Sequence, residues 1–484
     1  MQIVVILMGL VCGWLGAVAW LAISRRSETK SLFDALGKSI RALLSDDGQF
    51  LRAYGALLVC VGIWLFWNIL ALAAAVAPLA LVCWLFQRPL EGHLMLFIIV
   101  YSVGSMASII WLGRRAKPGV AERGGLSVSD SQFFFLQLVE NAPWLMRKGA
   151  TLENRWLRSK LAGITIDRPI FVTGLARSGT TMLLELLSQS PDLASHRYSD
   201  FPFLMTPYFW NWFVRLFGAK KAAVERPHQD GIQITLESPD AFEEPLWQQY
   251  FLDTHRVVAS HRLDPSHHNP EFDHIFANQL RKILLIRKGR RYLSKGNYNV
   301  TRLEYLSSLF PDALFVVPIR HPIDQVTSLA RQHELFCEYS QHDPRVPHYM
   351  EAAGHYEFGP QRVPISVAGS GQQSVAAWAA GDEQRGYAIQ WAAVYGYIFE
   401  LLERCPAIAA RTFVVRYEDI CADPSTEMKK VLAHVQLDDP AGRILGSLGH
   451  IKRASARARE RNAANNVVWD VTQAVATKFG YQFD

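Results

Sequence analysis

The stretch from Arg168 to Leu193, "RPIFVTGLARSGTTMLLELLSQSPDL", constrains the fold of this 484-residue chain more than any other feature. A short β-branched run (169–174) leads into a glycine-containing loop, and an apolar helical pattern begins at Thr180. In such a loop the backbone N–H groups can turn toward an anion, and the new helix adds unpaired N–H donors and a partial positive charge. The layout predicts a phosphate-binding turn. A turn of the same shape that holds no ligand is the alternative.

Further runs of the same kind predict a sheet. Residues 313–320 ("ALFVVPIR") and 411–417 ("RTFVVRY") are short, β-branched or aromatic, as in buried parallel strands. Helical patterns separate these runs, over 180–189, 301–309, 322–335, 387–404 and 425–435. The alternation predicts an α/β fold with a P-loop-like parallel sheet flanked by helices. The stretches 225–274 and 340–386 show little periodicity and are predicted to be long irregular segments that act as lids or binding loops.

The first part of the chain is rich in apolar residues. Residues 3–24 carry no charge and are long enough to span a bilayer. A cleaved signal peptide is the alternative, but no Lys or Arg precedes the run and the run is too long. Residues 55–86 and 93–113 are predicted to form two further spans, although 55–86 could also fold as a hairpin and give a fourth.

Charge favours three spans. The loop 25–54 and the flank after residue 113 are both basic, and basic loops favour the cytoplasmic side of a membrane. If both lie on that side, the chain crosses the membrane three times and its N-terminus lies outside. We therefore predict a multi-pass integral membrane protein whose large domain faces the cytoplasm. Its predicted parts are an α-helical transmembrane region (1–113), a linker with a leading helix (114–150) and the α/β domain (151–484).

Composition excludes several classes of function. The formal net charge of +6 is small, and no basic stripe is interleaved with aromatic residues, so we expect no nucleic-acid partner. None of the six cysteines forms a CxxC pair, so neither a zinc site nor a disulfide framework is indicated.

The residues of the predicted turn indicate which anion it holds. The backbone and hydroxyl groups of the loop, and the guanidinium fork of its arginine, are suited to phosphate or sulfate oxygens. Six residues are expected to contact the anion: Gly174, Arg177, Ser178, Gly179, Thr180 and Thr181. An ATP-binding loop has lysine where Thr180 stands, so ATPase and kinase activities are disfavoured.

The segment Gly174–Thr181 resembles the 5′-phosphosulfate loop of sulfotransferases that use 3′-phosphoadenosine 5′-phosphosulfate (PAPS). The arginine makes it similar to the loop of Golgi tyrosylprotein sulfotransferases and of bacterial membrane-associated relatives. Residues 293–329 resemble the family's next block, in which a lysine precedes a helix and a strand ends in Arg-x-Pro, with a serine eight residues after the arginine. The resemblance implies that Arg320 and Ser328 hold the 3′-phosphate of PAPS.

Sulfuryl transfer needs a base near the acceptor and cations near the bridging oxygen, and it requires no metal. Arg177 and Lys295 are the candidate cations. A carboxylate pattern in "SPDAFEE" resembles that of the membrane-type relatives and implies Glu243 or Glu244 as the base; alternatively these acids only favour a helix N-terminus. His228 is the next candidate for the base.

The combined hypothesis is a membrane-anchored sulfotransferase that takes PAPS as co-substrate. The expected acceptor is a hydroxyl, or secondarily an amine, of a lipid, glycan or other molecule at the bilayer. A P-loop nucleotide kinase and a non-catalytic nucleotide-binding membrane sensor or scaffold are the alternatives.

Overall fold

The computed structural model describes five single positions (126, 128, 133, 136 and 139) and the ranges 143–217, 224–229, 233–451 and 461–483. The chain divides into two compact units, Met1–Ala121 and Glu122–Asp484, and every described residue belongs to the second. The predicted spans 3–24, 55–86 and 93–113 lie outside the described residues and stay predictions. In the described ranges, no helix combines the length and the apolar character needed to cross a membrane.

A five-stranded sheet with the strand order β2-β5-β1-β6-β7 forms the centre of the second unit. All four neighbouring pairs are parallel, which confirms the predicted α/β fold with a parallel sheet. The strands are β1 (Ile170–Val172), β2 (Leu193–Ala194), β5 (Arg291–Lys295), β6 (Leu314–Ile319) and β7 (Thr412–Arg416). A separate antiparallel pair joins β3 (Val224–Glu225) to β4 (Gln233–Ile234). The sequence predicted β1, β6 and β7, whereas β2 and β5 were missed.

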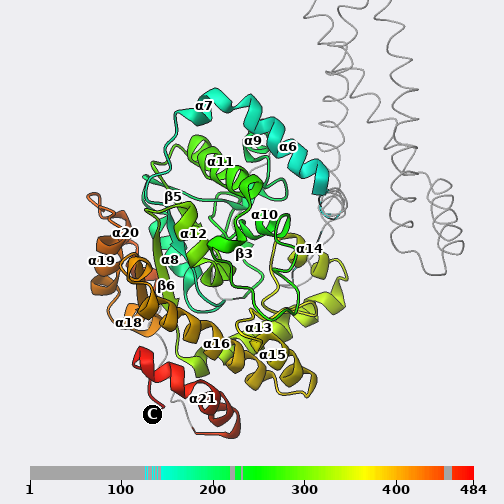
Figure 1. The fold of residues 1–484 in the computed structure, drawn as a ribbon, viewed down its shortest axis with the longest axis vertical. Coiled ribbons are helices and arrows are strands. Elements are labelled where there is room, and N and C mark those ends of the chain that lie inside the picture. The colour runs from blue at the N-terminus through cyan, green and yellow to red at the C-terminus, as the bar shows by residue number, and fades with distance from the viewer. Residues whose placement is uncertain are drawn as a thin grey trace, which may run out of the picture. The chain divides into compact units, whose positions relative to one another are not determined.

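Helices cover both faces of the sheet (Figure 1). The longer helices are α6 (Pro143–Trp156), α8 (Thr180–Leu187), α9 (Pro207–Phe217), α11 (Pro270–Arg287), α12 (Leu303–Leu309), α13 (Pro322–His342), α14 (Val346–Ala352), α15 (Ser370–Ala379), α16 (Glu383–Arg404), α19 (Pro424–His434) and α21 (Ala463–Ala476). The shorter ones are α7 (Arg158–Ala162), α10 (Glu244–Gln248), α17 (Pro406–Ala409), α18 (Tyr417–Ala422) and α20 (Arg443–Gly446). Single 3₁₀ turns, of which η3 (Asn297–Thr301) bears on the site, connect several of them.

The core lies in two layers because successive strand residues point to opposite faces. Phe171 packs with residues of α11, α12 and α16, whereas its neighbours Ile170 and Val172 pack with α8 and α19 on the other face. All three side chains are fully buried. The strand is therefore apolar throughout, as parallel strands covered on both faces are.

The two segments predicted to be irregular contain helices. Residues 225–274 include α10 and the start of α11, which Asn269 caps by accepting a hydrogen bond from the N–H of Phe272. Residues 340–386 include α14 and α15. Both helices are short, and α15 is rich in alanine, serine and glutamine, so they depend on packing against neighbouring elements.

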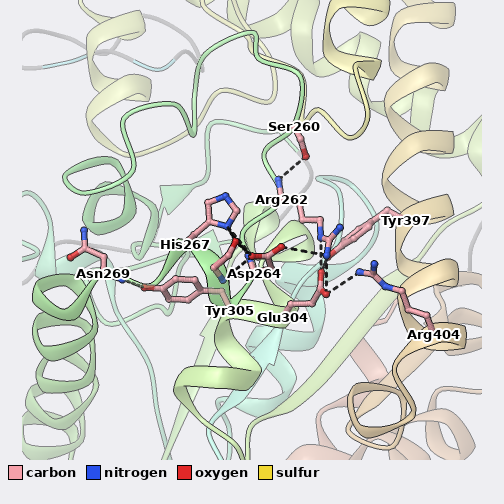
Figure 2. Close-up of polar contacts among 10 residues, drawn as sticks. Ser260, Arg262, Asp264, His267, Asn269, Glu304, Tyr305, Tyr397 and Arg404 are labelled. Carbon is pink, nitrogen blue, oxygen red and sulfur yellow. Dashed lines mark hydrogen bonds and ion pairs between the residues drawn. The ribbon is translucent and has the colours of Figure 1, made fainter.

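A polar cluster centred on Glu304 joins the loop before α11 to α12 and α16 (Figure 2). The Glu304 carboxylate accepts hydrogen bonds from Arg262 at 2.7 and 3.1 Å and from the Tyr397 hydroxyl at 2.9 Å. Arg404 forms an ion pair with it at 2.9 Å. One partly buried carboxylate thus holds three segments that are distant in the sequence.

Replacing Glu304 by alanine is expected to lower the free energy of unfolding by about 1–3 kcal/mol, because two guanidinium groups and a phenol lose their shared acceptor. Thermal unfolding of the purified chain measures this change. Asp253→Ala is the control, since the Asp253–Arg256 pair is about 70% exposed on each side and should contribute little. Equal unfolding temperatures for the two variants would contradict the prediction.

Candidate active site

The register of the sheet brings three chain segments to one edge. Val172 pairs with Lys295 on one side and with Val316 on the other. The carboxyl ends of β1, β5 and β6 therefore lie side by side, and the loop that follows β1 stands between Lys295 and Arg320. The Thr173 hydroxyl donates to the carbonyl oxygen of Gly296 at 2.7 Å and closes the gap between the first two segments. Ligands of open α/β sheets bind at this edge.

Tight backbone geometry shapes the loop. Gly179 caps α8 in a left-handed conformation with φ of 105°, and a Cβ atom there would lie 2.7 Å from a ring carbon of Tyr417. A Cβ atom on Gly174 would lie 2.8 Å from the carbonyl oxygen of Pro318. A side chain at either position would collide with a neighbouring group, so both positions require glycine. Arg177 adopts a positive φ of 69°, which is uncommon for a residue with a side chain.

A glutamine that was not predicted from the sequence holds the loop by hydrogen bonds to its backbone. Gln325 of α13 is fully buried and donates from Nε2 to the carbonyl oxygens of Leu175 and Ala176, at 3.3 and 2.9 Å. Its Oε1 accepts a hydrogen bond from the indole of Trp391 at 3.0 Å. The first half of the loop is thereby tied to α13 and α16. The signal that could have identified Gln325 is its place in the first turn of the helix that follows Arg320.

Three predicted ligand residues from separate elements meet at the loop. Arg177 donates from Nε to the hydroxyl of Ser328 at 3.1 Å. Arg320 donates to the carbonyl oxygen of Arg177 at 3.3 Å, and its guanidinium lies 4.9 Å from the ring centre of Tyr417. The buried Nε of Arg320 has no hydrogen-bond partner in the part of the chain that the structure describes. The arrangement concentrates donors and positive charge at one place.

A cleft of about 350 Å³ adjoins this group. Its walls are built from the loop, the β3–β4 region and α13: Arg177, His228, Gln229, Ser328, Arg331, Gln332, Glu334, Leu335 and Glu338. Within it, His228 is hydrogen-bonded to Gln332 at 2.8 Å. Burial, together with the charges of Arg226 and Arg177, lowers the pKa of His228 to about 3. His228 is therefore neutral at physiological pH and a weak base.

The remaining loop residues lie toward the start of α8. Ser178 is fully buried, and its hydroxyl lies under the turn, close to Gly174. Thr181 is half-buried in the first turn of the helix. The Thr180 hydroxyl donates to Asn297 Oδ1 at 3.3 Å, which links the helix start to η3.

From Asn297 a chain of polar contacts leads away from the loop. Asn297 donates from Nδ2 to Glu357 Oε1 at 2.6 Å, and Glu357 Oε2 lies 3.5 Å from Nδ1 of His355. Burial acts to raise the pKa of Glu357, but His355, Asn297 and Lys295 outweigh it and hold this pKa at about 2. The sequence did not single out Glu357 or assign a role to His355, because both belong to the segment predicted to be irregular.

Lys295 lies in the same polar group. It is 7% exposed, and its Nζ is 3.8 Å from Asp240 Oδ1. Burial acts to raise the pKa of Asp240, but Lys295, His355 and a hydrogen bond from Tyr198 outweigh it and hold this pKa at about 2. A small cavity is lined by Lys295, Asn297, His355 and Glu357, among others. The structure thus brings a lysine and a histidine together beside the phosphate-type loop.

The two predicted carboxylates are engaged in other contacts. Glu243 accepts hydrogen bonds from the hydroxyl of Tyr292 at 2.6 Å and from Asn299 at 3.0 Å. Glu244 forms a bidentate pair with Arg302 at 2.7 and 2.8 Å and contacts His255 at 2.8 Å. Burial acts to raise the pKa of Glu244, but Arg302 and His255 outweigh it and hold this pKa at about 2. These contacts tie α10 to β5 and η3.

Across the described ranges, no group of three or more His, Cys, Asp and Glu side chains is arranged to hold a metal ion.

Residues 169–359 match the model of the sulfotransferase family. The match spans the strand β1, the loop, Lys295, Arg320 and the segment that carries His355. It confirms the resemblance to sulfotransferases that the loop and the Arg-x-Pro block indicated. No match to a curated protein sequence was found.

Several solved structures are similar to this chain at low identity. Sulfotransferase STF1 of Mycobacterium tuberculosis is 18% identical, with 73% of this chain and 88% of that chain covered and a TM-score of 0.39. Sulfotransferase STF9 of Mycobacterium avium is 15% identical, with 68% and 82% covered and a TM-score of 0.40. The sulfotransferase domain from the curacin biosynthetic pathway is 11% identical, with 66% and 99% covered and a TM-score of 0.33.

Gly179→Ala is expected to destabilise the protein by about 1–3 kcal/mol, because the new methyl group meets Tyr417 and the left-handed backbone is strained. Thermal unfolding followed by circular dichroism measures the loss. Gly446→Ala is the matched control, since a Cβ atom there has open space around it. If the two variants unfold at the same temperature, the loop is less constrained than its contacts indicate.

Proposed function

With the sulfotransferase family match over residues 169–359 as the premise, we propose that this chain transfers a sulfuryl group from PAPS to a hydroxyl of a membrane-associated acceptor. The observation that carries the proposal is the convergence of Arg177, Ser328 and Arg320 at a loop between a strand and a helix start. PAPS carries two separate anionic groups, and this edge of the sheet offers two adjacent sets of donors. Thr180 in place of lysine weighs against a nucleotide kinase.

The residues present fit both anionic groups. The helix start and its hydroxyls suit the 5′-phosphosulfate, and Arg320 with Ser328 suits the 3′-phosphate. The unpartnered Nε of Arg320 is a buried donor that an anion would satisfy. The proposed set is Gly174, Arg177, Ser178, Gly179, Thr180, Thr181, Arg320 and Ser328. When bound, PAPS would supply a sulfuryl group activated by its link to phosphate.

Lys295 is the proposed cation beside the reacting group, together with Arg177. Its position at the end of β5, next to the strand that precedes the loop, supports this role. As the bond from sulfur to the phosphate oxygen breaks, the electron pair stays on that oxygen, and a nearby ammonium group stabilises the added charge. The low pKa of Asp240 keeps this carboxylate ionised, 3.8 Å from the Nζ of Lys295.

For the base we propose His355, oriented by Glu357. Glu244 lines the small cavity beside Lys295, but its carboxylate is engaged by Arg302 and His255. Glu243 accepts two hydrogen bonds, and the low pKa of His228 makes it a weak base. His355 lines this cavity with Lys295, and its Nδ1 lies 3.5 Å from Glu357 Oε2. It would take the proton of the acceptor hydroxyl while that oxygen forms its bond to sulfur, and the Glu357 carboxylate would stabilise the imidazolium.

The location of the enzyme and the class of acceptor are proposed from the sequence. The apolar runs 3–24, 55–86 and 93–113 support an integral membrane protein with its large domain on the cytoplasmic face. An anchored enzyme has ready access to a lipid, a glycolipid or another acceptor held at the bilayer.

Titration with 3′,5′-adenosine bisphosphate by calorimetry tests the donor site. Arg177→Ala and Arg320→Ala should each weaken binding by about 1.5–3 kcal/mol, as for a lost charge-assisted hydrogen bond. Arg256→Ala, at a side chain that is 69% exposed, is the control and should bind like the wild type. Preferential binding of ATP with magnesium would support a kinase instead, and binding of neither nucleotide would end the proposal.

Transfer of labelled sulfate from PAPS into a lipid extract tests the base. His355→Gln should lower the rate by about 10²–10⁴-fold, the range of general-base catalysis, while bisphosphate binding stays unchanged. His342→Gln, at an exposed position at the end of α13, is the control.

An unchanged rate of sulfate transfer in His355→Gln would show that the histidine is not the base. Glu243 and Glu244 would then be the candidates for the base. Bisphosphate binding by a wild-type protein that transfers no sulfate would favour the sensor or scaffold alternative.

A further inference from the structure

An exposed surface of aromatic and basic side chains runs over α6, α7 and α9. We call it the aromatic–basic face and define it by Trp144, Lys148, Leu152, Trp156, Lys160 and Trp212. Its large apolar members are more than half exposed: 54% for Trp144, 64% for Leu152, 62% for Trp156 and 58% for Trp212. Contiguous exposed apolar surface of this kind marks an interaction site more often than isolated residues do.

The spacing of the residues on α6 makes the face continuous along the helix. Positions 144, 148, 152 and 156 recur every four residues and so share one side. The opposite side is buried and includes Glu153, whose carboxylate forms an ion pair with Lys282 of α11 at 2.9 Å. Both partners of this pair are 0% exposed. Because breaking a buried pair is costly, α6 cannot turn its aromatic side inward.

Ring contacts extend the face from α6 to α9, which lie together over α11 (Figure 1). The Trp156 ring is 5.9 Å from that of Tyr208 and 5.2 Å from that of Phe209. Lys160 of α7 donates to the Tyr208 hydroxyl at 3.4 Å. Trp212 follows Tyr208 by one helical turn and carries the surface along α9.

The charge of the face has one sign. The segments 143–162 and 207–217 contain six Lys and Arg residues, and their single acid is Glu153, which is buried in its pair with Lys282. Lys148 lies 5.3 Å from the ring centre of Trp144, and Lys160 lies 5.8 Å from that of Trp156. Indole rings with lysines beside them are the groups that settle at the boundary between lipid headgroups and acyl chains.

We propose that the aromatic–basic face docks on the surface of a bilayer that contains anionic lipids. The indole rings and Leu152 enter the headgroup region, and Lys148 and Lys160 contact lipid phosphates. Two observations favour lipid as the occupant: the unopposed positive charge of the face, and the last apolar run of the sequence, which ends at residue 113 shortly before α6 begins at Pro143. The proposal rests on the membrane location proposed above, but it uses none of the residues of the sulfotransferase site.

Lysine acetylation of the full chain in lipid nanodiscs, followed by mass spectrometry, tests the docking. Discs of phosphatidylcholine alone are compared with discs that also contain phosphatidylglycerol. Acetylation of Lys148 and Lys160 should be several-fold slower in the anionic discs and should recover in about 1 M salt, where the screening length falls to about 3 Å. Lys288 and Lys429, which are exposed elsewhere on the domain, should react equally in all conditions.

A charge-reversal variant, Lys148→Glu with Lys160→Glu, provides the second measurement. Both side chains are exposed, so the fold should be retained, and oxidation of Trp144 and Trp156 by hydroxyl radicals replaces acetylation as the readout. In the wild type, the anionic discs should slow the oxidation of Trp144 and Trp156. In the variant, the two tryptophans should be oxidised at the same rate in both kinds of disc. Lys288→Glu is the matched control and should behave like the wild type.

Three results would overturn the proposal. Equal reactivity of Lys148 and Lys160 in both discs and in detergent would mean that the face stays in water. Protection that is insensitive to lipid charge and to salt would mean that the apolar segments of this chain, or a second copy, cover the face. A chain that associates with neither kind of disc would also contradict docking. None of these results bears on bisphosphate binding.

Discussion

The hydrogen-bond ladder around β1 is the constraint on which the rest of the structure depends. Val172 pairs with Lys295 of β5 on one side and with Val316 of β6 on the other. A slip of one residue would exchange the side chains of Phe171 and its neighbours between two packed faces, so the core specifies the register. The same register sets the loop after β1 between Lys295 and Arg320. The geometry of the site is in this sense a product of core packing.

Two polar groups lie at the two ends of the loop and differ in character. Arg177, Arg320 and Ser328 form a cluster of donors, whereas the contacts that start at Thr180 pass to carboxylates and a histidine. Cations and donors suit an anionic donor substrate, and a lysine beside a histidine suits proton removal from an acceptor. Other buried charges, such as the bidentate pair of Glu244 and Arg302, belong to neither of these two polar groups and hold elements of the fold together.

The same core also orients the outer surface. Lys282 is on α11, which packs on the sheet through Phe272 and Phe276, and its buried ion pair with Glu153 sets the rotation of α6. The aromatic–basic face points outward because the other side of the helix is occupied. A surface on α6 and the site at the sheet edge are thus held in one domain, which would keep the site at a constant orientation to a bilayer.

Local sequence determined the parts of this protein whose residues lie close together in the chain. The loop Gly174–Thr181 was predictable because the strand, turn and helix patterns span few residues there, whereas Arg320 and Ser328 were selected by the resemblance to sulfotransferases. The strand β5 was missed because "RYLSK" mixes charged and polar residues, and their burial depends on neighbours on both sides.

The remaining features were decided by the tertiary structure alone. Asn297 and Glu357 are 60 residues apart, and Gln325 contacts loop carbonyls 149 and 150 residues away. No local pattern encodes such contacts, since they depend on how elements distant in the sequence pack together. The membrane spans within 3–113 lie outside the described residues and rest on hydropathy and charge. The sequence by itself thus predicted the strand, loop and helix start around Gly174–Thr181, and the packed sheet decided which side chains surround that loop.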